Sequence, residues 1–290
     1  MKKLLINQHG QLRNGWWILI FVALIALTRP LYSLIRGSLL DWQVQELWLE
    51  PLSLVLILCV TWICCRLRQQ RLADAGWHLD LRAFKLFQAG LLFSVIQIAI
   101  IVGIIWLAGG VSFELNSNRS FEPLLLGFYI FLCAAIMEEL LFRGFIFQRL
   151  IEGVGVWPAQ LGLALLFAIG HWSNPDMEGA TLIWASLDIG LGAILWGLAF
   201  IRTGSLALPI GMHLGWNWAQ GNIFGFAVSG HEHQGWLQPI LQDSPAWLTG
   251  STFGPEASVV AVIVDLAAII VLWRWKGFKD NAVVAKPAIA

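Results

Sequence analysis

The sequence has few charged residues and no net charge. Lys, Arg, Asp and Glu make up 12% of its 290 residues, and 18 basic residues balance 18 acidic ones, whereas soluble domains contain about 25% charged residues. With 58% hydrophobic residues, the composition instead indicates a polytopic membrane protein. A nucleic-acid partner is not expected, because the basic residues are scattered along loops and form no basic patch.

Cysteine is also scarce. The four cysteines (Cys59, Cys64, Cys65 and Cys133) fall in or beside apolar segments, so we expect packing residues and no disulfide framework. The sequence shows no internal repeat, low-complexity tract or soluble domain. Its first apolar segment is too long for a signal-peptide core and is followed by no small-residue cleavage site. We therefore expect that segment to remain in the mature chain.

Long apolar runs are what the sequence does contain. Windows of about 20 apolar residues are long enough to cross the hydrocarbon core of a bilayer. Eight windows of this kind occur, at 16–35, 47–65, 84–108, 124–150, 157–172, 181–201, 205–220 and 258–275. The sequence therefore predicts an all-α, polytopic transmembrane bundle of about eight helices. The windows at 157–172 and 205–220 are the shortest and the least secure as crossings.

The loop charges predict the orientation of this bundle. With eight crossings, most loop Lys and Arg residues fall on one side of the membrane and most loop acids on the other. By the positive-inside rule, both termini are then cytoplasmic, in a multi-pass protein of the cell membrane. The longest connection, 221–257, lies outside the cytoplasm, and we expect its His231-Glu232-His233 cluster to be solvated. Pro255 and Glu256 suit the first turn of the last helix.

Two adjacent acids and an arginine interrupt the apolar segment 135–144. A central Arg or Asp in a lipid-exposed helix costs about 2.5 to 3.5 kcal/mol, so these groups need a compensating role. Glu139 and Arg143 are four residues apart and share a helix face, which predicts an ion pair. Glu138 is turned about 100° away. It is therefore a free carboxylate, suited to act as a general base.

Two further polar pairs follow in later apolar windows. Phe167 and His171 are four residues apart, so the phenyl ring is expected to pack against the imidazole. His213 and Asn217 repeat this spacing with two hydrogen-bonding side chains. Counted from the predicted helix ends, Glu138 and both histidines lie well inside the bilayer. Their depths predict one shared site.

This ordered set, Glu-Glu-x-x-x-Arg, then Phe-x-x-x-His, then His-x-x-x-Asn, resembles the type II CAAX prenyl endopeptidase and bacteriocin-processing (Abi) family of intramembrane proteases. The resemblance implies that Glu138 and His171 activate a water molecule. It assigns His213 and Asn217 to stabilising the oxyanion. The substrate would be a membrane-associated protein or peptide, and membrane lipid would surround the site.

The same resemblance assigns a supporting ion pair to Glu139 and Arg143, and the four-residue spacing gives Phe167 its supporting role beside His171. We divide the chain into N-terminal helices (1–110), a catalytic core (111–220), the extracytoplasmic loop (221–257) and a last helix with a short cytoplasmic tail (258–290). Motifs of serine, cysteine and His-Glu-x-x-His zinc proteases are not visible.

Several alternatives remain open. Glu138, His171 and His213 form a residue set suited to a three-ligand catalytic zinc site. A non-proteolytic scaffold or immunity protein, or a small transporter that relays protons through buried acids, would also place polar side chains in membrane helices. Asp188 is a candidate partner of the site, and Asp265 is expected to pair within the bundle. Gly211 and Gly215 bracket His213 at a spacing that favours close helix packing.

Overall fold

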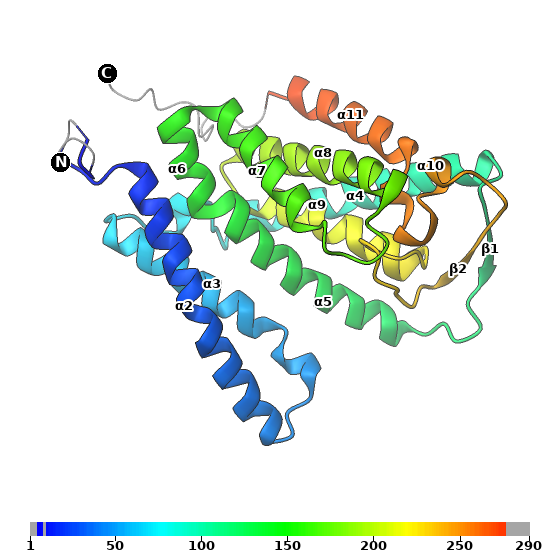
Figure 1. Cartoon of the computed structure of the whole chain (residues 1–290), viewed down its shortest axis with the longest axis horizontal. Helices are drawn as coiled ribbons and strands as arrows, with labels where there is room; N and C mark the ends of the chain where they lie inside the picture. Colours follow the sequence, from blue (N-terminus) through cyan, green and yellow to red (C-terminus); the bar gives the residue numbers. More distant parts are fainter. Residues whose placement is uncertain (1–4, 8–9, 277–290) are drawn as a thin grey trace.

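The computed structural model describes residues 5–7 and 10–276 and consists mainly of helices, with one two-stranded sheet (Figure 1). The helices are α2 (Asn14–Asp41), α3 (Pro51–Leu67), α4 (Leu81–Leu107), α5 (Phe121–Glu139), α6 (Phe145–Val154), α7 (Val156–Gly170), α8 (Gly179–Thr203), α9 (Ala207–Trp218), α10 (Ala246–Thr249) and α11 (Val259–Arg274). The strands are β1 (Val111–Leu115) and β2 (Leu237–Leu241). Each of the eight apolar windows coincides with helix, and window 124–150 covers both α5 and α6.

The length and hydropathy of five helical segments suit them to crossing a membrane. Within the described residues these are Asn14–Asp41, Glu46–Leu67, Leu81–Leu107, Phe121–Val154 and Gly179–Thr203. The protein is therefore membrane-embedded. Helices α7, α9 and α11 are shorter. At about 1.5 Å per residue, none of them reaches across a hydrocarbon core of about 30 Å. The count of eight crossings stays a prediction.

Helices α4 and α9 form the closest helix pair of the core, and glycines permit it. A Cβ added at Gly211 would collide with the carbonyl oxygen of Phe87, and one added at Gly215 with that of Leu91. Gly90 of α4 meets the backbone of α9 in the same way. The expected close packing around His213 is thus present, and its partner helix is α4. This contact fixes α9 and the side chains it carries.

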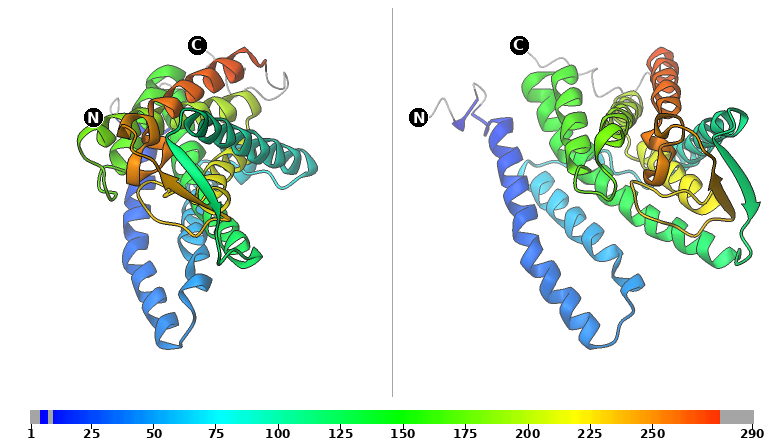
Figure 2. Two further views of the ribbon diagram at one scale, coloured as in Figure 1. Left: turned by 90° about the vertical axis from the view of Figure 1, so that its right-hand side faces the viewer. Right: turned by 45° about the vertical axis from the view of Figure 1, so that its right-hand side comes forward.

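The first two long helices lie at the periphery. Figure 2 shows the α2–α3 hairpin diverging from the other helices toward its tip. Phe21 is the single buried residue of α2, and it stacks on Phe145 of α6 with ring centroids 5.5 Å apart. Most of the α2 surface is therefore free to face lipid.

The segment that follows α9 is more ordered than an open loop. Strand β2 lies in the expected extracytoplasmic connection and pairs antiparallel with β1, with Val111 opposite Leu241. Phe113 of β1 packs edge-on against Phe226, with ring centroids 5.9 Å apart. This aromatic contact and the backbone pairing hold the connection over the end of the bundle.

The assignment of Pro255 and Glu256 to the first turn of the last helix is wrong. Pro255–Ala257 forms a separate 3₁₀ turn, and α11 begins at Val259. Ser258 is the N-cap of α11, because its hydroxyl oxygen accepts a hydrogen bond from the Ala261 N–H at 3.1 Å. The separate turn directs Glu256 into the interior, where it is 4% exposed.

Candidate active site

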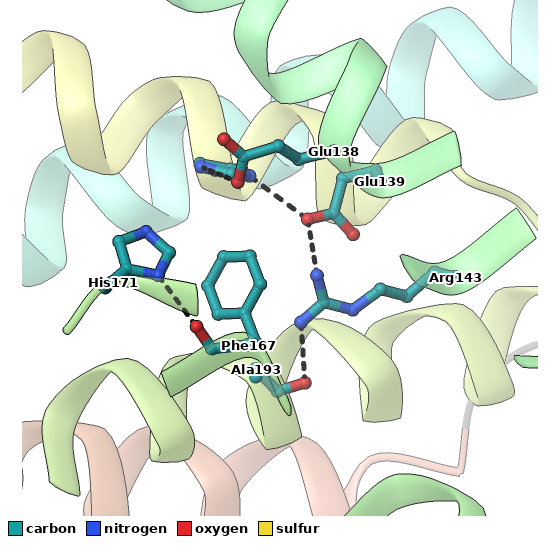
Figure 3. A network of polar contacts seen from close by, with 7 residues as sticks. Glu138, Glu139, Arg143, Phe167, His171 and Ala193 are labelled. Carbon is teal, nitrogen blue, oxygen red and sulfur yellow. Dashed lines mark hydrogen bonds and ion pairs between the residues drawn. The ribbon is translucent and has the colours of Figure 1, made fainter. Parts of the chain in front are cut away.

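A buried ion pair connects α5 to α8. The Arg143 Nη1 atom donates to Glu139 Oε1 at 2.9 Å, and Nη2 donates to the carbonyl oxygen of Ala193 on α8 at 3.0 Å (Figure 3). Both charged side chains are at most 3% exposed. Arg143 lies in the π-helical turn Leu140–Gly144, a wider turn that often occurs at functional sites. The predicted ion pair is present, and it braces two helices.

His213 of α9 is held by contacts on two sides. Its Nδ1 atom is 3.1 Å from Glu139 Oε1, and the ring of Trp196 stacks on the imidazole at 4.1 Å with an interplanar angle of 19°. An ionised carboxylate only accepts hydrogen bonds, so Nδ1 carries the proton. The other nitrogen, Nε2, is 3.8 Å from Glu138 Oε2. Glu139 thereby fixes the tautomer of His213 and turns Nε2 toward Glu138.

His171 directly follows α7, and a carbonyl group in the last turn of α7 fixes its tautomer. The Nδ1 atom is 2.8 Å from the carbonyl oxygen of Phe167, which only accepts, so Nδ1 donates (Figure 3). The Phe167 ring packs on the imidazole with centroids 4.7 Å apart, as its spacing predicts. The Arg143 guanidinium lies 5.1 Å from the centroid of the same ring. In neutral His171, the Nε2 lone pair is therefore available as a proton acceptor.

All four residues predicted to carry chemistry line one cavity of about 600 Å³. They are Glu138, His171, His213 and Asn217. Glu138 Oε2 is buried and has no hydrogen-bond partner within the described residues. Its side chain is nevertheless 26% exposed, so the carboxylate is within reach of a molecule in the cavity. The structure thus brings these residues together around one space.

Sequence reasoning missed several other residues of this cavity. His231 and Glu232 are exposed, as expected of a solvated loop, whereas His233 is half-buried. Glu256, which was expected at a helix end, lines the cavity together with His231 and His233. His233 packs on Phe131 with ring centroids 4.9 Å apart. Burial lowers the pKa of His233, and the neighbouring charge of His231 lowers it further. No local pattern in the sequence signals these contacts, because each joins distant segments.

Glu256 contributes a buried carboxyl group to the same cavity. Burial raises the pKa of Glu256, while a hydrogen bond from the backbone N–H of Ser229 acts in the opposite direction. Asp188 also lines the cavity, and Asp265 accepts a hydrogen bond from Gln97 Nε2 at 2.5 Å. The expected pairing of Asp265 within the bundle is therefore present. The sequence does mark Asp188 and Asp265 as candidates for a functional site, because each is a single acid in an apolar helix.

The residues do not form a ready-made metal centre. Across residues 5–7 and 10–276, no group of three or more His, Cys, Asp or Glu side chains is arranged to hold a metal ion. In both His171 and His213, Nδ1 is engaged in a hydrogen bond, and Nε2 remains for a proton, a hydrogen bond or a metal. We derive no catalytic step through a metal from this arrangement.

The fold and the site together define a membrane-embedded helical protein with buried glutamate and histidine side chains around one cavity. Residues 120–219 match the family model of Rce1-like type II CAAX prenyl endopeptidases. This match confirms the family resemblance, and it contains every motif residue from Glu138 to Asn217.

One curated relative is similar over a longer stretch. The uncharacterized protein YyaK of Bacillus subtilis (strain 168) is 30% identical over 180 residues, which cover 58% of this chain and 54% of YyaK. The match therefore spans about half the length of that relative. No solved structure is similar enough to count as a match.

Proposed function

We propose that the protein is an intramembrane endopeptidase of the cell membrane that hydrolyses a peptide bond with a water molecule activated by Glu138 and His171. The observation that carries the proposal is the buried Glu138 Oε2 atom, which has no hydrogen-bond partner among the described residues and lies in the same cavity as both histidines. A carboxylate oxygen without a hydrogen bond in a membrane helix is costly, and such groups are typical of functional sites.

In the first step, the bound water transfers a proton to the base formed by Glu138 and His171. Its oxygen attacks the carbonyl carbon of the substrate, and the carbonyl oxygen takes up the negative charge. The Asn217 amide N–H is suited to donate a hydrogen bond to this oxyanion. Losing one such donor typically costs about 100- to 1000-fold in rate. The captured proton then passes to the leaving amine as the C–N bond breaks.

The tautomer of His213 determines whether this side chain can donate a hydrogen bond to the oxyanion. Because Nδ1 donates to Glu139, neutral His213 has only a lone pair on Nε2. His213 therefore donates to an oxyanion only as an imidazolium. The carboxylates of Glu138 and Glu139 lie on either side of the ring, at 3.8 and 3.1 Å from its two nitrogens. This arrangement supports the assignment of His213 to oxyanion stabilisation.

The first test is cleavage of a fluorogenic membrane-peptide library by the purified protein. We expect Glu138→Gln to lower the rate by about 100-fold or more, because it removes the general base while keeping the shape of the side chain. Glu122→Gln is the matched control, since Glu122 lies on the same helix but is exposed. Undiminished cleavage by Glu138→Gln would refute the assignment of the site.

Chelation distinguishes the zinc alternative. We expect wild-type activity to survive exhaustive chelation. Loss of activity on chelation and its return with Zn²⁺ would instead assign Glu138, His171 and His213 as metal ligands. A scaffold protein would show no activity that depends on Glu138.

A further inference from the structure

The cavity extends past the proposed catalytic residues to two buried aspartates. Asp188 of α8 and Asp265 of α11 both line it and are 2% and 1% exposed. Asp188 Oδ1 and Asp265 Oδ2 have no hydrogen-bond partner among the described residues. Gln97 donates its amide N–H to Asp265. The Oε1 atom of Gln97 is also buried and has no hydrogen-bond partner among the described residues, so it is a further acceptor beside Asp265. Three hydrogen-bond acceptors thus collect here without a hydrogen-bond partner among the described residues.

Among the described residues that line the cavity, the only side chains able to carry a positive charge are four histidines. The residues that line the cavity, within the described part of the chain, include no Lys or Arg. Arg143 is engaged with Glu139 and Ala193 instead. His233 is largely neutral at neutral pH, because burial lowers its pKa. A buried acid without a partner is costly, so the arrangement calls for a donor that enters the cavity from outside the protein.

We propose that Asp188 and Asp265 form a subsite that binds a positively charged side chain, Lys or Arg, of the peptide substrate. This inference rests on the proposed function, because the peptide that presents this side chain is the one that the active site cleaves. A cationic group that donates several hydrogen bonds meets the need of both unpartnered carboxylate oxygens.

The geometry of α8 places this subsite relative to the scissile bond. Asp188, Gly192 and Trp196 are spaced by four residues and share one face of the helix. A Cβ added at Gly192 would lie 3.7 Å from Asp265 Oδ2, so Asp265 is within one turn of Asp188. Trp196, one turn further, stacks on His213.

Eight residues of helix correspond to about 12 Å, which is the length of about three to four residues of extended peptide. A Lys or Arg side chain spans part of this 12 Å itself. We therefore expect the basic residue of the substrate about one to three positions away from the cleaved bond.

The test is a binding measurement that does not require cleavage. Hydrophobic peptides with neutral ends, each carrying a single Lys at successive positions, are compared with matched peptides that carry norleucine there. Binding to the Glu138→Gln protein in lipid nanodiscs is followed by fluorescence anisotropy of the labelled peptides. We expect at least one Lys peptide to bind about tenfold or more tightly than its norleucine partner, because charged hydrogen bonds are strong.

Substitutions in the Glu138→Gln background then locate the effect. Asp188→Asn and Asp265→Asn keep the shape of each side chain and remove its charge, so each should reduce the Lys preference while norleucine binding persists and reports an intact fold. Asp243→Asn is the matched control, because Asp243 is exposed and does not line the cavity. The proposal is overturned if no Lys peptide binds better than its partner, or if the preference survives in the double variant. Neither result depends on whether the wild-type protein cleaves peptides.

Discussion

At the scale of single residues, Glu139 joins Arg143 and His213, two side chains that organise the site. One carboxylate oxygen contacts both Arg143 at 2.9 Å and His213 at 3.1 Å. The neighbouring residue, Glu138, makes no such bond through Oε2. Two adjacent glutamates thus have different surroundings: Glu139 fixes the positions of its neighbours, and Glu138 keeps one oxygen without a hydrogen bond, as its proposed role as general base requires.

Removing the arginine from this arrangement should destabilise the fold strongly. We expect Arg143→Ala to lower the free energy of unfolding by about 3 to 5 kcal/mol, because it leaves the carboxylate of Glu139 buried without its charge partner. Thermal unfolding followed by tryptophan fluorescence, together with denaturant titration in mixed micelles, measures the loss.

Arg36→Ala is the control, because Arg36 pairs with Glu46 at 2.6 Å while their side chains are 38% and 73% exposed. An exposed pair contributes at most about 1 kcal/mol. Equal losses in the two variants would show that burial does not strengthen the Arg143 pair.

The sequence predicted the residue pairs that lie on one helical turn. The ion pair of Glu139 with Arg143 and the packing of Phe167 on His171 both follow from a spacing of four residues. The hydrogen bond between His213 and Glu139 joins positions 74 residues apart, and nothing local indicates it. Contacts of this kind depend on how whole helices pack, which residue spacing does not encode.

At the scale of elements, the α4–α9 contact holds the proposed oxyanion side of the site. Gly211 and Gly215 allow the two backbones to touch on either side of His213. The sequence predicted close packing at these glycines but not the partner helix, because α4 lies more than 100 residues earlier in the chain. The paired strands β1 and β2 escaped prediction for the same reason.

Filling this contact should displace His213. We expect Gly215→Leu to destabilise the protein by at least about 1 to 3 kcal/mol and to abolish peptide cleavage, because the new side chain collides with backbone of α4. Unfolding and cleavage are measured on the same preparation. The control is Gly103→Leu on α4, where an added Cβ meets no atom within 4 Å. Full activity in Gly215→Leu would contradict the packing argument.

At the scale of the whole molecule, the small sheet constrains how the chain crosses the membrane. Because β1 pairs with β2, the segments before α5 and after α9 lie on the same side of the bundle. An even number of crossings must therefore separate them, and the eight-window prediction places four there. The sequence alone did not supply this check, since it required the pairing of two distant strands.

Labelling of single cysteines tests the predicted topology. In a background without the four native cysteines, we expect Ser117→Cys to react with a membrane-impermeant maleimide added to intact cells, because it precedes α5 on the extracytoplasmic side. Arg71→Cys, between α3 and α4, should react only after the cells are opened. Both positions are exposed, so accessibility differs through sidedness alone. The reverse pattern would invert the orientation.

The peripheral position of α2 has a consequence for how the sequence changes over time. This helix has 28 residues and buries only Phe21. Selection therefore acts on most of its positions through overall apolarity and length and not through side-chain shape. Neutral drift should accumulate in α2 much faster than in α9, where nine of twelve residues are buried. Homologues that preserve the same chemistry will then differ most in the part of the chain that faces the lipid.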